Sequence, residues 1–292
     1  MKNLFTKARP SQKKARVLIT GGPGNGKTRS ALILAEGLGK KIAVIDTEKN
    51  SSTNYGDEHK FDTIDYSKWY KSHNPFNYIK LVDMVIENGY DVLIIDSFSH
   101  AWEGVGGILE LNDEAAQTMN GNTWSAWGKT KKMYTAPLFN KVLMENNLHV
   151  ICTARTKIER EMQTNSEGKT KIVKMGSKIR QQADIEYEFD LVLDMKKDEE
   201  GSAPQRFATV EKTRFTKLFK DDEKNRFVID EAFANRIREH YKSATADTLD
   251  EVKQLVSYAE NTQELGVIFK QYPELAESKE FKAIFEKRSE EL

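Results

Sequence analysis

A glycine-rich stretch near the start of the chain carries the residue types that bind phosphate. Residues 18–30 read LITGGPGNGKTRS, and the spacing of Gly21, Gly26, Lys27 and Thr28 fits the pattern G-x-x-x-x-G-K-[ST]. In this pattern backbone N–H groups surround the phosphates, the lysine reaches the β and γ phosphates, and the hydroxyl holds Mg²⁺. The loop is expected to bind ATP and Mg²⁺ through Gly22, Pro23, Gly24, Asn25, Gly26, Lys27, Thr28 and Arg29.

Two carboxylates could complete the chemistry of a bound triphosphate. Asp96 ends the apolar run DVLIID and is expected to orient Mg²⁺ together with the loop hydroxyl. The next residue, Ser97, supplies no carboxylate, so another residue must accept the proton of an attacking water. Glu48 follows the apolar run KIAVID and is the candidate. The alternative is that residues 46–48 only cap a turn.

The apolar runs indicate the elements that must position these residues. Several of these runs are continuous, which is typical of strands buried on both faces. Strands are expected at 16–20, 41–46, 61–66, 91–96, 148–154 and 187–195, and antiparallel edge strands at 206–219 and 225–230. Helices are expected at 27–38, at 75–88 after an Asn74 N-cap and a first-turn Pro75, and at about 129–146. This alternation predicts an α/β fold with a mainly parallel twisted sheet covered by helices.

Two long connections, residues 99–127 and 155–186, leave the carboxyl ends of expected strands. Open α/β sheets bind ligands at that edge, and loops of this length inside a compact domain are usually functional. Residues 155–180 of the second connection hold eight basic and three acidic side chains, a net charge of +5. This excess favours a polyanionic ligand, with a solvated loop as the alternative.

The first connection carries three tryptophans that could stack on unpaired bases. Each such stack contributes about 1–3 kcal/mol to the binding of single-stranded nucleic acid. Trp124 and Trp127 are three residues apart, which favours a shared core face of a helix, whereas Trp102 stays open between the two interpretations. The expected DNA contacts are Trp102, Lys169, Lys171, Lys174, Lys178 and Arg180.

The phosphate loop, VIDTE and IIDS occur in the order found in the RecA-like ATPases, which the chain resembles. In that family the glutamate matching Glu48 polarises the attacking water, and loops after the strands ending near Asp96 and Ala154 bind DNA. More narrowly, DSFSHAWEG, HVICTARTK, GSKIRQQADIEYEFDLVLDM and VEKTR resemble the phage-encoded, single-domain RecA-like P-loop ATPases of single-strand annealing and recombination. The resemblance covers residues 14–220. It implies a RecA-like P-loop NTPase fold.

Lys212 and Arg214, in VEKTR, lie two residues apart on an expected strand and therefore project to the same side. In RecA-like hexamers and filaments related to the DnaB helicases, a K-x-R pair reaches the γ phosphate bound by the neighbouring subunit. The resemblance thus implies a ring or filament of identical chains, with a solvated basic strand edge as the alternative. Where the family typically has glutamine after the second-loop strand, this chain has TAR, so a sensing role falls to Thr153 or Arg155.

The composition is that of an ordinary globular protein, with 38% hydrophobic residues, 31% charged residues and a net charge of zero over 292 residues. No apolar run approaches the ~18 residues that would span a bilayer, and no signal peptide is recognisable, which predicts a cytoplasmic protein, in the host cytoplasm if phage-encoded. Cys152 lies in an apolar run and is expected to be buried.

The expected domains are a basic N-terminal tail (1–15), a RecA-like core (16–242) and an acidic helical tail (243–292) with helix breaks at Asn261 and Pro273.

These features predict an ATP-dependent protein that binds single-stranded DNA, forms homo-oligomers and hydrolyses ATP between subunits during recombination or annealing. A single-strand-binding protein or another recombination factor is a further expected partner, and no membrane is expected. Two alternatives stay open: a replication helicase or loader-type motor with the same core, and a nucleotide-gated scaffold without significant turnover.

Overall fold

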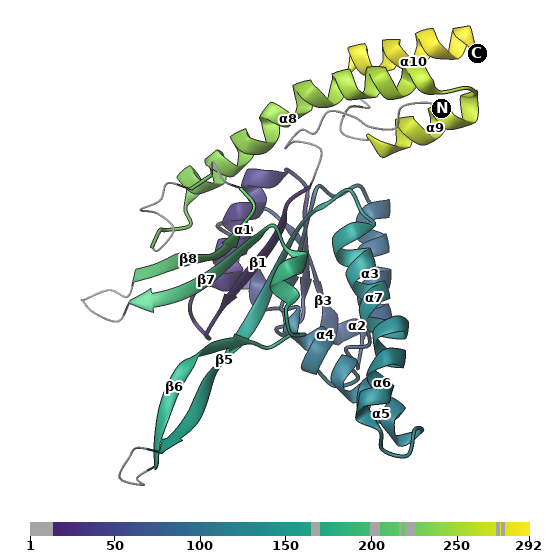
Figure 1. Ribbon diagram of the computed structural model, residues 1–292. Helices are drawn as coiled ribbons and strands as arrows, with labels where there is room; N and C mark the ends of the chain where they lie inside the picture. The colour runs from purple at the N-terminus through teal and green to yellow at the C-terminus, as the bar shows by residue number, and fades with distance from the viewer. Residues whose placement is uncertain are drawn as a thin grey trace. The chain divides into compact units, whose positions relative to one another are not determined.

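The structure, a computed structural model, describes residues 14–164, 170–198, 205–215, 218–219, 226–272, 275 and 278–292 (Figure 1). The chain divides into two compact units, one of residues 15–235 and one that contains residues 236–292. Among the helices of the described ranges, none is long and apolar enough to cross a membrane.

The larger unit is built on an eight-stranded sheet. Its strands are β1 (Arg16–Gly21), β2 (Ile42–Asp46), β3 (Asp62–Asp65), β4 (Val92–Asp96), β5 (His149–Thr164), β6 (Thr170–Ile179), β7 (Leu191–Asp198) and β8 (Gln205–Thr213). The order is β3-β2-β4-β5-β1-β7-β8, with β6 paired to β5. From β3 to β7 neighbouring strands are parallel, and β8 runs antiparallel to β7. The expected mainly parallel α/β sheet is confirmed, although of the edge strand expected at 225–230 only a bridge between Phe227 and Ala208 forms.

Helices cover both faces of this sheet, which is why β1, β2 and β4 are buried along their whole length. On one face Leu18, Ile95 and the fully buried Cys152 join the core formed with α3 (Pro75–Glu87) and the helical run that follows α6. Helix α1 (Lys27–Leu38) also packs on the sheet, against β1, β4 and β5. The Asn74 side chain accepts the Phe76 N–H at the start of α3, which confirms the expected cap.

The connection at 99–127 is helical rather than a loop. It contains α4 (Ser99–Glu103), α5 (Ile108–Gln117) and α6 (Thr123–Thr130). The helical run continues through a π turn, α7 (Ala136–Phe139) and a second π turn to Met144, so the helix expected at 129–146 begins earlier. Pro137 lies between the two π turns, and because it has no N–H it cannot make the regular hydrogen bond there.

Within the connection at 155–186, residues 155–164 and 170–179 form strands rather than the expected loop. β5 continues beyond the sheet and pairs antiparallel with β6, so the two strands form an arm that extends from the core (Figure 1). A short 3₁₀ turn, η5 (Ile185–Glu188), leads from this arm into β7. The sequence did not indicate these strands because they are rich in charged residues and contain no continuous apolar run.

The smaller unit is helical and has its own apolar core. Its helices are α8 (Glu231–Tyr258), which begins in the larger unit, α9 (Thr262–Gln271) and α10 (Lys279–Glu291). Their buried residues include Val252, Val256, Leu265, Phe281 and Phe285. The Asn261 side chain caps α9, as the expected break requires, whereas Pro273 lies outside the described residues. The helices do not begin near Thr245 as expected, because the apolar spacing of Phe233, Ala234 and Ile237 already supports helix from Glu231.

Candidate nucleotide site

The glycine-rich loop connects β1 to α1. Gly26 has φ of 90°, a conformation that L residues rarely adopt, and it directly precedes the first helical residue, Lys27. A Cβ on Gly21 would lie 2.6 Å from the Met195 carbonyl oxygen, so the loop can pass β7 only without a side chain. In this part of the structure no side chain caps α1. The first-turn N–H groups are therefore available to an anion.

Lys27 folds back over its own loop. Its Nζ donates to the carbonyl oxygens of Gly21 and Gly22, at 3.0 Å each. Burial lowers the pKa of Lys27, and the carboxylates of Asp96 and Glu48 act in the opposite direction. A bound polyphosphate would neutralise the desolvated ammonium of Lys27 and accept hydrogen bonds from the backbone N–H groups beside it.

Asp96, at the end of β4, lies beside the loop although β5 separates β4 from β1 in the sheet. The Thr28 hydroxyl donates to Asp96 Oδ2 at 2.5 Å, and the Thr153 hydroxyl donates to Asp96 Oδ1. Burial raises the pKa of Asp96, and these two hydrogen bonds oppose the increase.

A hydroxyl and a carboxylate so close together fit the hard oxygen ligands that Mg²⁺ prefers. The described residues contain no cluster of three or more His, Cys, Asp or Glu side chains arranged for a metal. Thr28 and Asp96 would therefore hold Mg²⁺ jointly with the nucleotide and water, as is usual for this ion. The metal roles of both residues stay predictions.

Glu48 stands at the carboxyl end of β2, next to β4. The buried carboxylate of Asp46 accepts the N–H groups of Glu48 and Ser52, each at 2.7 Å, so the capping turn weighed from the sequence does exist. The side chain that caps this turn is that of Asp46, however, whereas the Glu48 side chain contacts Arg155. Both of its oxygens accept from Arg155, Oε1 from Nε at 2.8 Å and Oε2 from Nη2 at 2.5 Å.

This ion pair controls the charge of Glu48. Burial alone would raise the pKa of Glu48, but the hydrogen bonds and positive charge of Arg155 outweigh it and hold the pKa below its usual value. His100 and Lys27 lower it further. Glu48 is thus a half-buried carboxylate that stays ionised at neutral pH, as a proton acceptor must, but both its oxygens are occupied.

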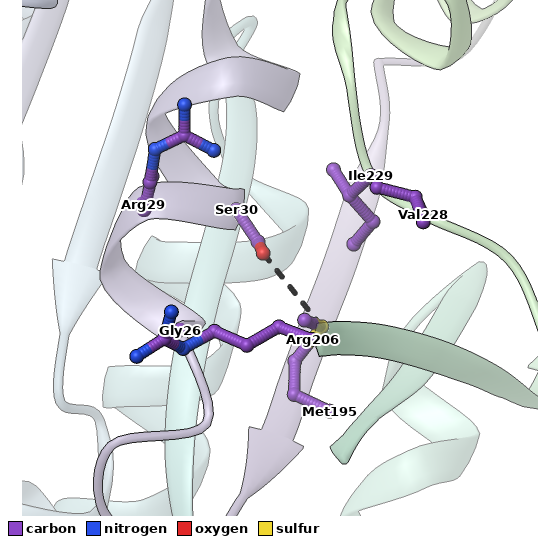
Figure 2. Close-up of a pocket in the computed structure, with 7 residues that line it drawn as sticks. All are labelled: Gly26, Arg29, Ser30, Met195, Arg206, Val228 and Ile229. Atoms are coloured by element: carbon purple, nitrogen blue, oxygen red, sulfur yellow. Dashed lines mark hydrogen bonds between the residues drawn. The ribbon is translucent and has the colours of Figure 1, made fainter. Parts of the chain in front are cut away.

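Arg206 is a residue that the sequence did not reveal. It extends from β8 across the loop, where its Nε donates to the Gly24 carbonyl oxygen at 3.0 Å (Figure 2). In the sequence Arg206 is only one basic residue in an expected edge strand, 182 positions from Gly24, so no local pattern indicates their contact. Arg206, Gly26 and Arg29 line both of two adjoining pockets.

The two pockets differ in character. The first, of about 300 Å³, is lined by Arg206, by Tyr55 of the 3₁₀ turn η2 (Ser51–Tyr55), and by Gly24, Gly26, Lys27, Thr28 and Arg29. The second, of about 270 Å³, adds Ser30, Met195, Val228 and Ile229 and is shown in Figure 2. There the Ser30 hydroxyl contacts the Met195 sulfur at 3.7 Å. Methionine and aliphatic side chains beside a guanidinium suit a flat aromatic ring.

The loop and the two carboxylates belong to one end of the sheet. A family model described as an AAA domain (AAA_24) matches residues 13–217. The chain belongs to this AAA-domain family. The matched AAA domain contains the phosphate loop, Glu48, Asp96 and the β5–β6 arm, and ends before α8. The chain is therefore a P-loop NTPase.

Other comparisons add little to the assignment of the AAA domain. Among curated proteins none matches. Among solved structures, the chain is similar to a KaiC-like protein, PH0186, from Pyrococcus horikoshii OT3. The similarity has a TM-score of 0.38 and 20% identity, and covers 69% of this chain and 80% of the archaeal one.

Lys212 and Arg214 lie away from the loop of their own AAA domain. The Lys212 Nζ donates to the carbonyl oxygens of Glu186 and Phe189 at 2.6 and 2.8 Å. Arg214 donates to Asp190 Oδ1 and to the Tyr187 carbonyl oxygen, both at 3.0 Å. Asp190 directly precedes β7, whereas the loop adjoins β7 at Met195. Both cations are therefore near the amino end of β7 and do not join the site of their own chain.

The predicted DNA contacts are only partly described. Lys169 lies outside the described residues, and Lys171 and Lys174 are placed on β6 without their side chains. Lys178 and Arg180 are exposed, and Arg180 Nη1 is 3.3 Å from Glu103 Oε1.

The tryptophans are arranged differently from the expectation. Trp102 and Trp127 are half-buried against the core and stack with ring centroids 5.6 Å apart. Trp124 is 87% exposed, so Trp124 and Trp127 do not share a core face as expected. The face of α6 that is buried is the one with Ala126 and Thr130. Trp124 lies off this face, and Trp127 lies only partly on it.

Proposed function

We propose that this AAA domain hydrolyses ATP between the subunits of a homo-oligomer and acts on single-stranded DNA in annealing or recombination. The observation that carries the proposal is the contact of the Thr28 hydroxyl with the Asp96 carboxylate beside the phosphate loop. Burying a carboxylate costs free energy because the carboxylate loses its hydration. A loop with only a structural role would gain nothing in return. A nucleotide with a divalent cation gives that carboxylate a role.

Each residue has a distinct task in binding. The N–H groups at the start of α1 and the Lys27 ammonium would replace their present partners, water and loop carbonyls, with phosphate oxygens. The base would enter the pocket formed by Met195, Val228 and Ile229, with Arg206 over its edge. Thr28 and Asp96 would hold Mg²⁺, which would neutralise charge on the bound phosphates.

Glu48 is the proposed proton acceptor for the attacking water. It follows β2, the strand next to β4, and so belongs to the same sheet edge as the loop. Its pKa lies below the usual value, which keeps it ionised, although the two hydrogen bonds from Arg155 also make it a weaker base.

The proposal of an intersubunit site draws on the location of Lys212 and Arg214. Because they lie near the amino end of β7, they can stabilise charge only at the site of a neighbouring subunit. An arginine supplied in this way contributes about 10³–10⁵ to the rate of phosphoryl transfer in other ATPases and GTPases. Single-stranded DNA would follow the exposed cations of the β5–β6 arm, with the exposed ring of Trp124 as a stacking surface.

One observation favours the alternative of a nucleotide-gated scaffold, since the ion pair with Arg155 engages both Glu48 oxygens and lowers the pKa of Glu48, which makes it a weaker proton acceptor. Turnover separates the two functions. ATP hydrolysis should be measured for the wild type, Glu48→Gln and the control Glu114→Gln, an exposed carboxylate of α5, with and without single-stranded DNA. An ATPase loses at least about 100-fold in rate with Glu48→Gln and nothing with Glu114→Gln. Wild-type turnover in Glu48→Gln would contradict the assignment of the proton acceptor.

A further inference from the structure

Lys212 and Arg214, at the end of β8, differ in how firmly the chain holds them. The Lys212 ammonium donates to the carbonyl oxygens of Glu186 and Phe189 and lies 5.4 Å from the centroid of the Tyr187 ring, so it ties the turn η5 to β8. The Arg214 side chain is 51% exposed and makes two side-chain hydrogen bonds within the described residues. A guanidinium has five N–H groups, so three of them stay available to an anion. Arg214 is therefore the cation that can bind a further group.

Asp190 provides a fixed point for the Arg214 guanidinium. Its Oδ1 accepts from Arg214 Nη1 at 3.0 Å, and the Asp190 side chain is only 4% exposed. The backbones of the two residues are joined as well, because the Arg214 N–H donates to the Asp190 carbonyl oxygen at 2.8 Å. The Asp190 N–H in turn donates to the carbonyl oxygen of Arg16 on β1, also at 2.8 Å. The carboxylate is thus attached to the central strands of the sheet.

A second contact sets the plane of the guanidinium. Arg214 Nη2 donates to the Tyr187 carbonyl oxygen at 3.0 Å, and the turn that carries this carbonyl is anchored by the buried side chains of Ile185 and Phe189. A guanidinium is rigid and planar, so fixing two of its nitrogens fixes the direction of its other N–H groups. The chain itself therefore orients Arg214, before any other molecule binds.

The burial of Asp190 suits this orienting task. Burying a carboxylate costs free energy unless a cation and hydrogen bonds compensate it, and Arg214 supplies both. A basic strand edge that served only solubility would need no buried counter-ion. A cation that stabilises a transition state does need one fixed direction, because a displacement of about 1 Å can cost about 100-fold in rate.

We propose that Asp190 is a positioning residue that holds the Arg214 guanidinium in the orientation in which it stabilises the γ phosphate bound by the neighbouring subunit. Asp190 itself touches neither the nucleotide nor Mg²⁺ and acts only through Arg214. The inference rests on the proposed function, because it presumes that Arg214 acts at the site of a neighbour. The alternative is that Asp190 only stabilises the edge of the sheet.

Steady-state kinetics test the role of Asp190. ATP hydrolysis should be measured for the wild type, Asp190→Asn, Arg214→Gln, the double variant of both, and the control Asp198→Asn. Asp198 forms a comparable pair with Arg226, at 3.0 Å, at the other end of β7. Asp190→Asn should lower kcat about 10- to 100-fold with the KM for ATP unchanged, because the loop that binds ATP is intact. The double variant should be no less active than Arg214→Gln, and Asp198→Asn should match the wild type.

Mixed assemblies show on which side of the interface the defect lies. Asp190→Asn subunits keep Glu48, so an equal mixture with Glu48→Gln should recover about a quarter of the wild-type rate. A mixture of Asp190→Asn with Arg214→Gln should show no recovery beyond the mean of its components, because both variants lack an oriented cation. A loss of sheet stability alone would not sort the variants in this way.

Failure of this inference can be distinguished from failure of the proposed function. If Arg214→Gln mixed with Glu48→Gln shows no recovery, the site shared between subunits is wrong, and the inference is overturned with it. If that mixture recovers but Asp190→Asn has the kcat of the wild type, or shows no recovery with Glu48→Gln, only the role of Asp190 is wrong. Circular dichroism checks the fold of Asp190→Asn. Should this variant not fold, the smaller Asp190→Ser takes its place with the same expected results.

Discussion

At the residue scale, His100 links the turn that carries Glu48 to helix α4. Its Nδ1 lies 2.7 Å from the Thr47 hydroxyl, which also accepts the Ser97 N–H. Its ring stacks on His73 with centroids 5.0 Å apart. Burial first, and then the positive charge of Arg155, lower the pKa of His100 to about 4, while Glu48 acts in the opposite direction. The imidazole is therefore neutral in the folded protein at neutral pH.

This shift predicts a pH dependence of stability. An unfolded histidine titrates near 6.5, so between about pH 4 and 6.5 the unfolded state binds more protons than the folded state at this position. The free energy of unfolding should rise with pH in that window, by at most about 1.4 kcal/mol per pH unit from this group, and level off above it. Chemical denaturation of the wild type and His100→Asn from pH 4 to 7.5 measures the slope. The variant should show a shallower rise, and equal slopes would contradict the neutral, buried state of His100.

The residues of the site were predictable where they follow a known loop pattern or stand just after the carboxyl end of a parallel strand, the edge at which such sheets bind ligands. Lys27 and Thr28 follow a recognisable loop pattern, and Asp96 and Glu48 end apolar strands whose carboxyl ends meet at one edge. Residues that contact each other only through the tertiary fold leave no local pattern in the sequence. The Arg155 contact with Glu48 joins residues 107 positions apart, and only the sheet order shows that they are near each other.

At the element scale, the β5–β6 arm connects the nucleotide site to a cationic surface. The part of β5 within the sheet is visible in the sequence as a continuous apolar run, because that part is buried on both faces. The antiparallel pair of β5 and β6 has no such run, so its sequence resembles that of a loop. The helices of residues 99–127 were not predictable because they are short and interrupted by glycines such as Gly104 and Gly121.

The arm predicts how DNA binding should respond to charge. Replacing both Lys157 and Lys178 with glutamine should weaken binding of single-stranded DNA similarly for all sequences, because cations that bind phosphate carry no base information. The slope of log K against log salt should decrease by about 0.7 for each phosphate that the variant no longer neutralises. Fluorescence anisotropy at several salt concentrations measures both effects. Lys40→Gln with Lys60→Gln, two exposed lysines elsewhere, is the charge-matched control. An unchanged affinity and slope in the arm variant would exclude the arm as the DNA-binding surface.

At the scale of the whole molecule, the proposed oligomer follows from cations that cannot serve their own site. Lys212 and Arg214 are bound near the amino end of β7, away from the phosphate loop. In the proposed assembly each subunit supplies the loop and Glu48 to one interface and these cations to the other. Activity is then a property of neighbouring pairs.

Mixed assemblies test this arrangement. Glu48→Gln lacks the proton acceptor and Arg214→Gln lacks the finger, so each variant alone should be nearly inactive. In an equal mixture about one interface in four joins an intact Glu48 to an intact Arg214, so activity should return to about a quarter of the wild-type rate. The ATPase rate of the mixture, after incubation that allows exchange, gives the answer. A mixture no more active than its components would contradict a site shared between subunits.

The proposed role of the loop from Gly21 to Thr28 is to hold the phosphates of ATP, and equilibrium binding of ATP with Mg²⁺ tests this role most directly. The affinity should be compared for the wild type, Lys27→Ala and Lys40→Ala, a lysine exposed beyond the other end of α1. Lys27→Ala should bind at least about tenfold more weakly, a loss of about 1.4 kcal/mol, because the desolvated ammonium then no longer meets the phosphates. Lys40→Ala should bind like the wild type. Wild-type affinity in Lys27→Ala would contradict the claim.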